Sequence, residues 1–397
     1  MTETAIFNQP EKRLLLFCAR TQLDAEISSN MKALLKQGIN WQQFLQMALE
    51  HSIVPLVCSH LGALDEEFVP SNIKRLLEQY SQQITKHNFR LTRELLKILA
   101  LFKQENIPVV PFKGPVLTIA AYGNLALRSF SDLDILVHKH DVLRAKELLL
   151  AHNYFLQSPL TNLQEAAHLR DDYVYDLMRQ DGQVHIELHW AITSNCIPFS
   201  LDLAHLEKNL QPLTWAGTTV PNSSSEDTLV ILCVHGTKHI WERLGWICDV
   251  AELIEASPSM DWERVMALAK LSKSLRMVQL GLFLAHSLLH AELPDHVWQE
   301  LKSDRRIQQL AGHVKHKLFA ASSHARISDD FFILKTIENV PGRVGYALHL
   351  VTTPSVEERA LLPDSFAFLW WIIRPLRLLT KYGAQFIGIR PQQKGAH

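Results

Sequence analysis

The chain has 397 residues, of which 47% are hydrophobic and 20% are charged, with 40 lysines and arginines against 41 aspartates and glutamates. This is a globular composition, and it excludes a disordered tail, a collagen-like repeat and a disulfide-rich miniature scaffold. A net charge of −1 argues against a strongly basic surface that wraps nucleic acid. The length predicts two or three domains.

Cysteines and apolar segments bear on the cellular compartment. The five cysteines are scattered and form no Cys-x-x-Cys pair, which argues against a zinc ribbon or a disulfide framework and favours a reducing compartment. The first residues include Glu3 and Glu11 and lack a long apolar core, so no signal peptide is expected. No apolar run reaches the roughly 20 residues that span a bilayer. We therefore expect a cytoplasmic protein without a transmembrane segment.

Helical periodicity dominates the first hundred residues. Apolar residues recur at spacings of three and four from Leu35 to Ile53 and again from Leu91 to Phe102. Pro55 marks a helix break or a new helix start. No metal-ligand or nucleophile pattern occurs in this region. We expect residues 1–105 to form a helical packing domain.

The pattern changes at residue 107. A β-type run over residues 107–112 ends in Lys113–Gly114, and Pro115 suits the first turn of a following helix. Asp181–Gly182 is a hairpin turn signal. Three more β-type runs are predicted, at residues 133–137, 173–178 and 184–190, with a helix after the first of them. A small α/β core is thus expected over residues 106–200.

Helical patterning returns after the polar linker at residues 221–225 and continues to about residue 320. A final amphipathic segment, residues 366–382, has three interpretations: it lies on a membrane surface, docks a partner, or packs on the body, which is the commonest case. The predicted class is α+β, a small mixed-sheet core flanked by helical regions at residues 1–105 and 201–397.

Two aspartates stand out in the second predicted strand. Asp132 and Asp134 share one face of it, because successive strand residues point to opposite faces, while the apolar residues between and after them take the other. Neighbouring carboxylates repel each other. A bound divalent cation removes that repulsion, and oxygen ligands suit magnesium. The alternative is a solvated strand end.

Two other features favour a metal and phosphate site. Glu187, with His185 and His189 beside it, lies on the polar face of the last predicted strand and offers a third carboxylate. The histidines are expected to hydrogen-bond to the carboxylates, and direct ligation of the metal by either of them is the less favoured alternative. At the Lys113–Gly114 turn, a glycine lets backbone N–H groups approach phosphate oxygens, and Lys113 adds a positive charge.

His235 and His239 share a helix face because they are four residues apart. Such a pair can bind zinc, with Asp249 as third ligand, as in a metal-dependent phosphohydrolase, but the glutamate of an H-E-x-x-H motif is missing. Two interpretations are favoured over zinc: the pair and Lys238 line the floor of a nucleotide cleft, or they pack in the core. Trp241 and Trp246 can stack a base, although core packing is commoner at helical spacing.

These motifs together resemble a known group. The order strand, glycine turn, helix, Arg-x-x-x-Asp-x-Asp and later acidic strand resembles the DNA polymerase β-like nucleotidyltransferase superfamily. Residues 111–114 and 128–137 resemble more closely the bacterial uncharacterised nucleotidyltransferase family, which has a type 5 nucleotidyltransferase domain. Segments at residues 39–51, 235–241 and 249–252 agree with it. Lys113–Gly114 replaces the superfamily's usual Gly-Gly or Gly-Ser pair.

The resemblance implies an activity. A nucleoside monophosphate, or a phosphoryl group, would pass from a nucleoside triphosphate, ATP above all, to a hydroxyl of a protein, peptide, tRNA or small molecule, for instance in peptide or natural-product biosynthesis. Asp132 and Asp134 would hold two magnesium ions. Glu187 would ligate the catalytic one and help to activate the hydroxyl.

The same resemblance implies a nucleotide-binding set. Lys113 and Gly114 would cradle the triphosphate. Arg128 would pair with a phosphate oxygen, unless it forms a structural salt bridge with a nearby carboxylate. The other members are Ser129, His235, Lys238 and His239.

Two alternatives stay open. One is a catalytically silent nucleotide-binding or scaffold protein on the same fold, against which three clustered acids argue. The other is a toxin-like tRNA nucleotidyltransferase, which would need a basic groove that the net charge does not support.

Overall fold

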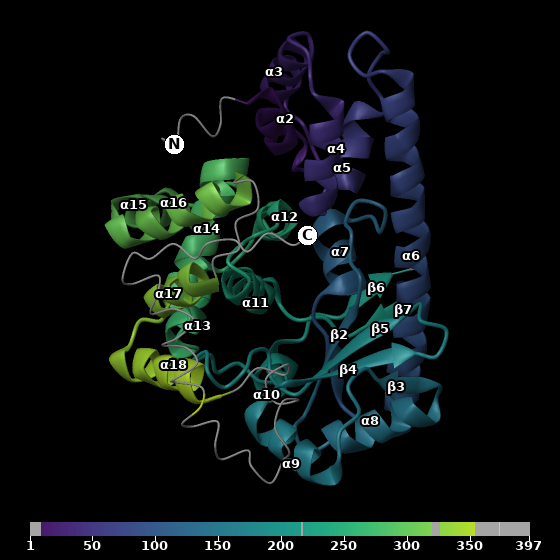
Figure 1. Ribbon diagram of the computed structural model, residues 1–397, viewed down its shortest axis with the longest axis vertical. Coiled ribbons are helices and arrows are strands. Elements are labelled where there is room, and N and C mark those ends of the chain that lie inside the picture. Colours follow the sequence, from purple (N-terminus) through teal and green to yellow (C-terminus); the bar gives the residue numbers. More distant parts are fainter. Residues whose placement is uncertain (1–8, 216, 320–325, 354–372, 374–397) are drawn as a thin grey trace, which may run out of the picture. The chain divides into compact units, whose positions relative to one another are not determined.

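The structure, a computed structural model, describes residues 9–215, 217–319, 326–353 and 373. By their contacts, residues 1–336 form one unit and residues 337–397 another, and the two are described separately. The first unit combines helices with a five-stranded mixed sheet, which confirms the predicted α+β class (Figure 1). The domain boundaries near residues 105 and 200 stay predictions.

Helices precede the sheet, as the periodicity predicted. The long helix α6 buries Leu91, Leu95 and Phe102 along one face. Pro55 lies in the first turn of α5, where its missing N–H costs nothing. The helices are α2 (Pro10–Cys18), α3 (Ala25–Leu35), α4 (Trp41–Glu50), α5 (Val54–Leu61) and α6 (Ser71–Gln104).

The five-stranded sheet has the order β1-β2-β5-β4-β3. β2 and β5 are parallel, and the other neighbouring pairs are antiparallel. The second predicted strand coincides with β2, and the predicted hairpin is β4–β5. The strands are β1 (Val109–Pro111), β2 (Leu133–Val137), β3 (Tyr154–Leu156), β4 (Val174–Arg179) and β5 (His185–His189).

The two faces of the sheet have different roles. Ile135 and Ile186 point into a core that α6 helps to form. On β2 and β5 the register pairs Asp134 with Glu187, so both acids lie side by side on the opposite face. Figure 1 shows α6 along one side of the sheet, with α11 (Ser225–Lys238) and α12 (Leu244–Glu255) on the other.

Short elements connect the strands. Pro115 sits in the first turn of α7, as predicted. Asp141 is the N-cap residue of α8, whose apolar side packs into the sheet's core. The connecting elements are α7 (Gly114–Tyr122), α8 (Val142–Ala151), α9 (Asn162–Asp171), α10 (Leu203–Leu206), the 3-10 helix η1 (Glu207–Asn209) and the hairpin β6 (Leu213–Trp215)–β7 (Thr218–Val220).

A helical layer built around α11 completes the first unit. Trp241 is fully buried, and a Cβ at Gly236 would lie 2.5 Å from its ring, so Gly236 lets the indole pack against the helix. Trp241 is therefore a core residue and not a platform for a base. The helices after α12 are α13 (Trp262–Leu271), α14 (Leu275–Leu289), α15 (Asp295–Ser303), α16 (Arg305–Phe319) and α17 (Arg326–Thr336).

The second unit is described mainly through α18 (Val340–Thr352), whose first turn is capped by the Asn339 side chain accepting from the Gly342 N–H. The amphipathic segment at residues 366–382 lies outside the described residues, apart from Ile373. Among the helices that the structure describes, none combines the length and the apolar character needed to cross a membrane.

Candidate active site

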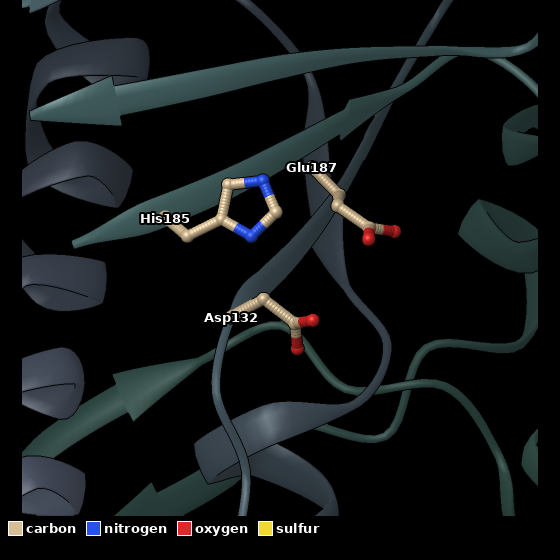
Figure 2. Close-up of side chains that lie close together, drawn as sticks. All are labelled: Asp132, His185 and Glu187. Atoms are coloured by element: carbon tan, nitrogen blue, oxygen red, sulfur yellow. The ribbon is translucent and has the colours of Figure 1, made fainter. Parts of the chain in front are cut away.

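Three carboxylates meet on the polar face of the sheet. Asp134 and Glu187 are partners in the β2–β5 register, and Asp132 lies one residue before β2 on the same face. One ligand atom each from Asp132, His185 and Glu187 lies within 4.8 Å of the others, and the same holds for Asp134, Glu187 and His189. Figure 2 shows the first of these groups converging from two chain segments. Alternation along each strand, together with the pairing of β2 and β5, thus brings the three acids together.

The charges of the cluster are unevenly compensated. Burial, and then repulsion by Asp134, raises the pKa of Asp132 to about 6. Burial alone would also raise the pKa of Asp134, but Lys113 and His189 outweigh it and hold that pKa well below its usual value. The Lys113 Nζ lies 2.8 Å from Asp134 Oδ1. Asp134 therefore has the Lys113 ammonium beside it. The charged form of Asp132, by contrast, would be stabilised by a further cation bound nearby.

His189 contacts two of the three carboxylates of the cluster. Its Nε2 lies 3.1 Å from Glu187 Oε2 and 3.4 Å from Asp134 Oδ1. Burial opposes protonation of this imidazole, but the hydrogen bonds to both carboxylates raise its pKa. The edge of its ring packs against Phe112, with the ring centres 5.0 Å apart. His189 thus orients the two acids, as the sequence interpretation expected of it.

The Lys113–Gly114 turn brings α7 close to the acids. Gly114 has φ = +53°, a conformation that favours glycine, and a Cβ there would lie 3.3 Å from the Asp132 carbonyl oxygen. The first turn of α7 therefore lies directly beside the acid cluster. Attraction by Asp134 and Glu187 overcomes the effect of burial and raises the pKa of Lys113, which stays charged.

The last turn of α11 supplies the facing wall. His235 Nδ1 lies 3.2 Å from the Lys113 Nζ, and Lys238 donates a hydrogen bond to the Tyr173 hydroxyl. Burial, followed by the nearby cations, lowers the pKa of His239 to about 3 and that of His235 well below its usual value. Both imidazoles are therefore neutral near pH 7. Burial also lowers the pKa of Lys238.

Trp246 continues this wall on α12. Its ring centre lies 5.3 Å from that of His235 and 5.2 Å from that of His239. The Arg243 guanidinium lies over the indole, 5.4 Å from the ring centre. Unlike Trp241, Trp246 is only half-buried and faces the site. It keeps the capacity to stack against a ligand ring.

Arg128 is engaged by a partner far away in sequence. Its Nε and Nη2 donate to the two carboxylate oxygens of Asp249, at 2.6 and 2.9 Å, and the Tyr122 hydroxyl donates to the same carboxylate at 2.7 Å. The structure thus contains the salt bridge that was the alternative to a phosphate contact. Because of this salt bridge, the Asp249 carboxylate already has a partner. Neither metal-compatible group among the described residues includes His235, His239 or Asp249, so the zinc interpretation gains no support.

One polar cavity of about 420 Å³ joins these parts. Asp176, Tyr173 and Trp246 line it as well, and of these only Trp246 was predicted from the sequence as a possible ligand contact. Asp176 was predictable: a two-residue turn at Asp181–Gly182 fixes the hairpin register and places it opposite Glu187, as observed. All the sequence-predicted site residues line the cavity: Lys113, Gly114, Arg128, Ser129, Asp132, Asp134, Glu187, His235, Lys238 and His239.

The donor set fits divalent cations. Carboxylate oxygens dominate it, and they are the ligands that Mg²⁺ and Mn²⁺ take in proteins. Glu187 belongs to both groups, so it could serve one cation together with Asp132 and another together with Asp134. Asp132, with its raised pKa, is stabilised as an anion by any cation placed there.

Comparison with known proteins gives a consistent result. No curated protein and no solved structure matches the chain. A family described as uncharacterised nucleotidyltransferase matches residues 37–290, a span that includes the whole acid cluster, the Lys113–Gly114 turn and the α11 wall. Because this match covers more than half of the chain, the protein belongs to the uncharacterised nucleotidyltransferase family.

Proposed function

We propose that the protein transfers a nucleoside monophosphate from a nucleoside triphosphate to a hydroxyl acceptor, with Mg²⁺ or a similar divalent ion. The observation that carries this proposal is the meeting of Asp132, Asp134 and Glu187 on one sheet face, opposite cationic side chains in a single cavity. The cavity of about 420 Å³ falls within the range of roughly 300–1,000 Å³ that is usual for small-molecule sites. Family membership supports the reaction class.

The proposed reaction exchanges one phosphorus–oxygen bond for another. The acceptor oxygen forms a bond to the α-phosphorus of the triphosphate, the bond from that phosphorus to the α–β bridging oxygen breaks, and pyrophosphate leaves. Glu187 takes the acceptor's proton and passes it to water. Divalent ions held by Asp132, Asp134 and Glu187 would supply charge stabilisation for the phosphoryl oxygens.

The cationic side chains position the triphosphate. The Lys113 ammonium, near the start of α7, lies between Asp134 and His235 and can contact phosphate oxygens from there. Backbone N–H groups at the Gly114 turn lie beside it. Lys238 adds a second ammonium at the opposite wall. Because His235 and His239 are neutral, they serve as hydrogen-bonding and stacking surfaces for the nucleotide.

Arg128 has a different proposed role. Its guanidinium is paired with Asp249, so its charge is already compensated. We assign it to holding α12 against the loop that carries Ser129 and Asp132. In this arrangement Arg128 and Asp249 fix the distance between the acid cluster and the α12 part of the wall.

A second candidate, nucleotide binding without turnover, is favoured by one observation. Lys113 already neutralises Asp134, so this carboxylate has a partner without any bound ion. Under this alternative the protein would bind a nucleotide for signalling or as a scaffold, and it would catalyse no transfer. The two candidates predict different consequences of changing Glu187.

The test is Glu187→Gln, with Glu292→Gln at an exposed site as the matched control. If Glu187 acts in the transition state, transfer of label from α-labelled ATP to acceptors in a cell extract should fall about 10²-fold or more. Affinity for a non-hydrolysable ATP analogue, measured by calorimetry, should stay within a few-fold. A variant that folds and retains the wild-type transfer rate would remove Glu187 from the mechanism. Wild-type protein that binds ATP but transfers no label would support the silent alternative.

A further inference from the structure

The acid cluster contains a nitrogen donor that a site made of carboxylates alone would lack. We propose that His185 is a ligand of the divalent ion held by Asp132 and Glu187, and that it shifts the preference of this position from Mg²⁺ toward Mn²⁺. The inference rests on the proposed function, because it assumes that the acids hold a cation. It names a residue and a metal class that the reaction type does not specify.

Geometry places His185 in the cluster. It lies on β5, two residues before Glu187, so both side chains project from the same face of the strand. Ligand atoms of Asp132, His185 and Glu187 lie within 4.8 Å of one another, a separation that one ion can bridge. Figure 2 shows the His185 ring beside both carboxylates, with one ring nitrogen on the side of Asp132.

The other ring nitrogen is fixed by a carboxylate outside this group. His185 Nε2 lies 3.2 Å from Asp176 Oδ1, across the β4–β5 pair. A neutral imidazole that donates its Nε2–H to Asp176 has its lone pair on Nδ1. Metal-bound histidines in proteins are commonly supported in this way, with the remote N–H donated to a carboxylate. Asp176 therefore orients His185 as a ligand.

His189 is not equivalent to His185. Its Nε2 lies within hydrogen-bonding distance of Glu187 and close to Asp134, so this nitrogen donates its hydrogen to carboxylates. A nitrogen that donates a hydrogen bond has no lone pair for a metal. The ring is also buried between Phe112 and Tyr173. Of the two histidines beside Glu187, the geometry thus points to His185 as the ligand.

A nitrogen ligand changes the selectivity of the site. Mg²⁺ takes oxygen ligands almost exclusively, whereas first-row transition ions accept imidazole readily. Relative to carboxylates alone, the set of Asp132, Glu187 and His185 should therefore favour Mn²⁺ over Mg²⁺. Replacement of His185 by asparagine should reduce that preference, because asparagine offers an amide oxygen instead.

The test uses Mn²⁺ as the probe, with the full-length protein and no nucleotide. Electron spin echo envelope modulation of bound Mn²⁺ detects a directly coordinated ¹⁴N nucleus. We expect this coupling in the wild type, its loss in His185→Asn, and its retention in the control His152→Asn, which removes an exposed imidazole at the end of α8. Affinity for Mn²⁺ should fall about tenfold or more in His185→Asn, and affinity for Mg²⁺ less.

Asp176→Asn is the second variant, for the case in which His185→Asn does not fold. It should keep the ¹⁴N coupling but weaken Mn²⁺ binding by roughly tenfold to a hundredfold. Bound Mn²⁺ without ¹⁴N coupling in the wild type, coupling that persists in His185→Asn, or unchanged Mn²⁺ affinity in Asp176→Asn would each overturn the role of His185 and leave the acid site standing. Failure of the wild type to bind any Mn²⁺ would overturn the proposed function as well.

Discussion

The raised pKa of Asp132 gives a measurable pH dependence of stability. Its pKa rises from 3.8 to about 6 in the folded protein, because the side chain is partly buried and Asp134 lies beside it. The folded state therefore holds this proton more tightly than the unfolded chain does. The free energy of unfolding should thus fall as the pH rises from 3.8 to about 6, and stay low above it.

Asp132→Asn isolates this effect, because the amide has nearly the same shape and does not titrate. A pKa change of about two units corresponds to about 3 kcal/mol. Because about a third of this effect is already present at pH 4.5, the variant should gain about 2 kcal/mol relative to the wild type between about pH 4.5 and about pH 7.5. Urea unfolding at both pH values measures the difference, with Asp295→Asn as the control at an exposed carboxylate. A difference that is independent of pH would refute the argument.

Three further predictions concern the acid cluster, the Gly114 turn and the Arg128–Asp249 ion pair. The double variant Asp132→Asn/Asp134→Asn should keep the wild-type circular dichroism spectrum and lose Mg²⁺-dependent ATP binding; unchanged calorimetric titrations would show that the cation site lies elsewhere. Gly114→Ala should cost about 1–2 kcal/mol in urea unfolding because of the positive φ, whereas Gly312→Ala, inside α16 with open space around it, should be neutral or stabilising. Asp249→Asn leaves the buried Arg128 without its carboxylate and should lower the free energy of unfolding by about 3 kcal/mol, and a change below 1 kcal/mol would mean that the ion pair does not hold α12.

The local sequence pattern was sufficient to predict the two strands that carry or adjoin the acids. Alternation of polar and apolar residues predicted β2 and placed Asp132 and Asp134 on one face and Ile135 on the other, as the structure shows. The same reasoning placed Glu187 on the polar face of β5. Side-chain period on a strand depends only on backbone geometry, so it can be derived without knowledge of the fold. No pattern indicated the three-residue strands β3, β6 and β7, whereas β1, which is equally short, was predicted because it lies within a longer β-type run.

Long-range pairing could not be derived in this way. That β2 and β5 are parallel neighbours, and that Asp134 therefore meets Glu187, depends on the topology of the whole core. The partner of Arg128 lies 121 residues away on another helix, and the contact from Lys113 to His235 spans 122 residues. Such contacts leave no periodic trace in the sequence. Local reasoning could therefore predict that Arg128 binds either a phosphate or a carboxylate, but not which of the two it binds.

Lys113 makes the two proposed cation positions unequal. Its ammonium lies 2.8 Å from Asp134 and compensates that carboxylate directly, whereas the group of Asp132, His185 and Glu187 does not include Asp134. A bare cation would therefore meet least competition at the Asp132 position. If the site binds a triphosphate as proposed, the phosphates would attract the Lys113 ammonium and weaken its hold on Asp134, and this carboxylate would become available to the cation that accompanies the nucleotide. In the proposed function the same lysine would thus keep Asp134 ionised before nucleotide binding and would link the filling of the second position to it.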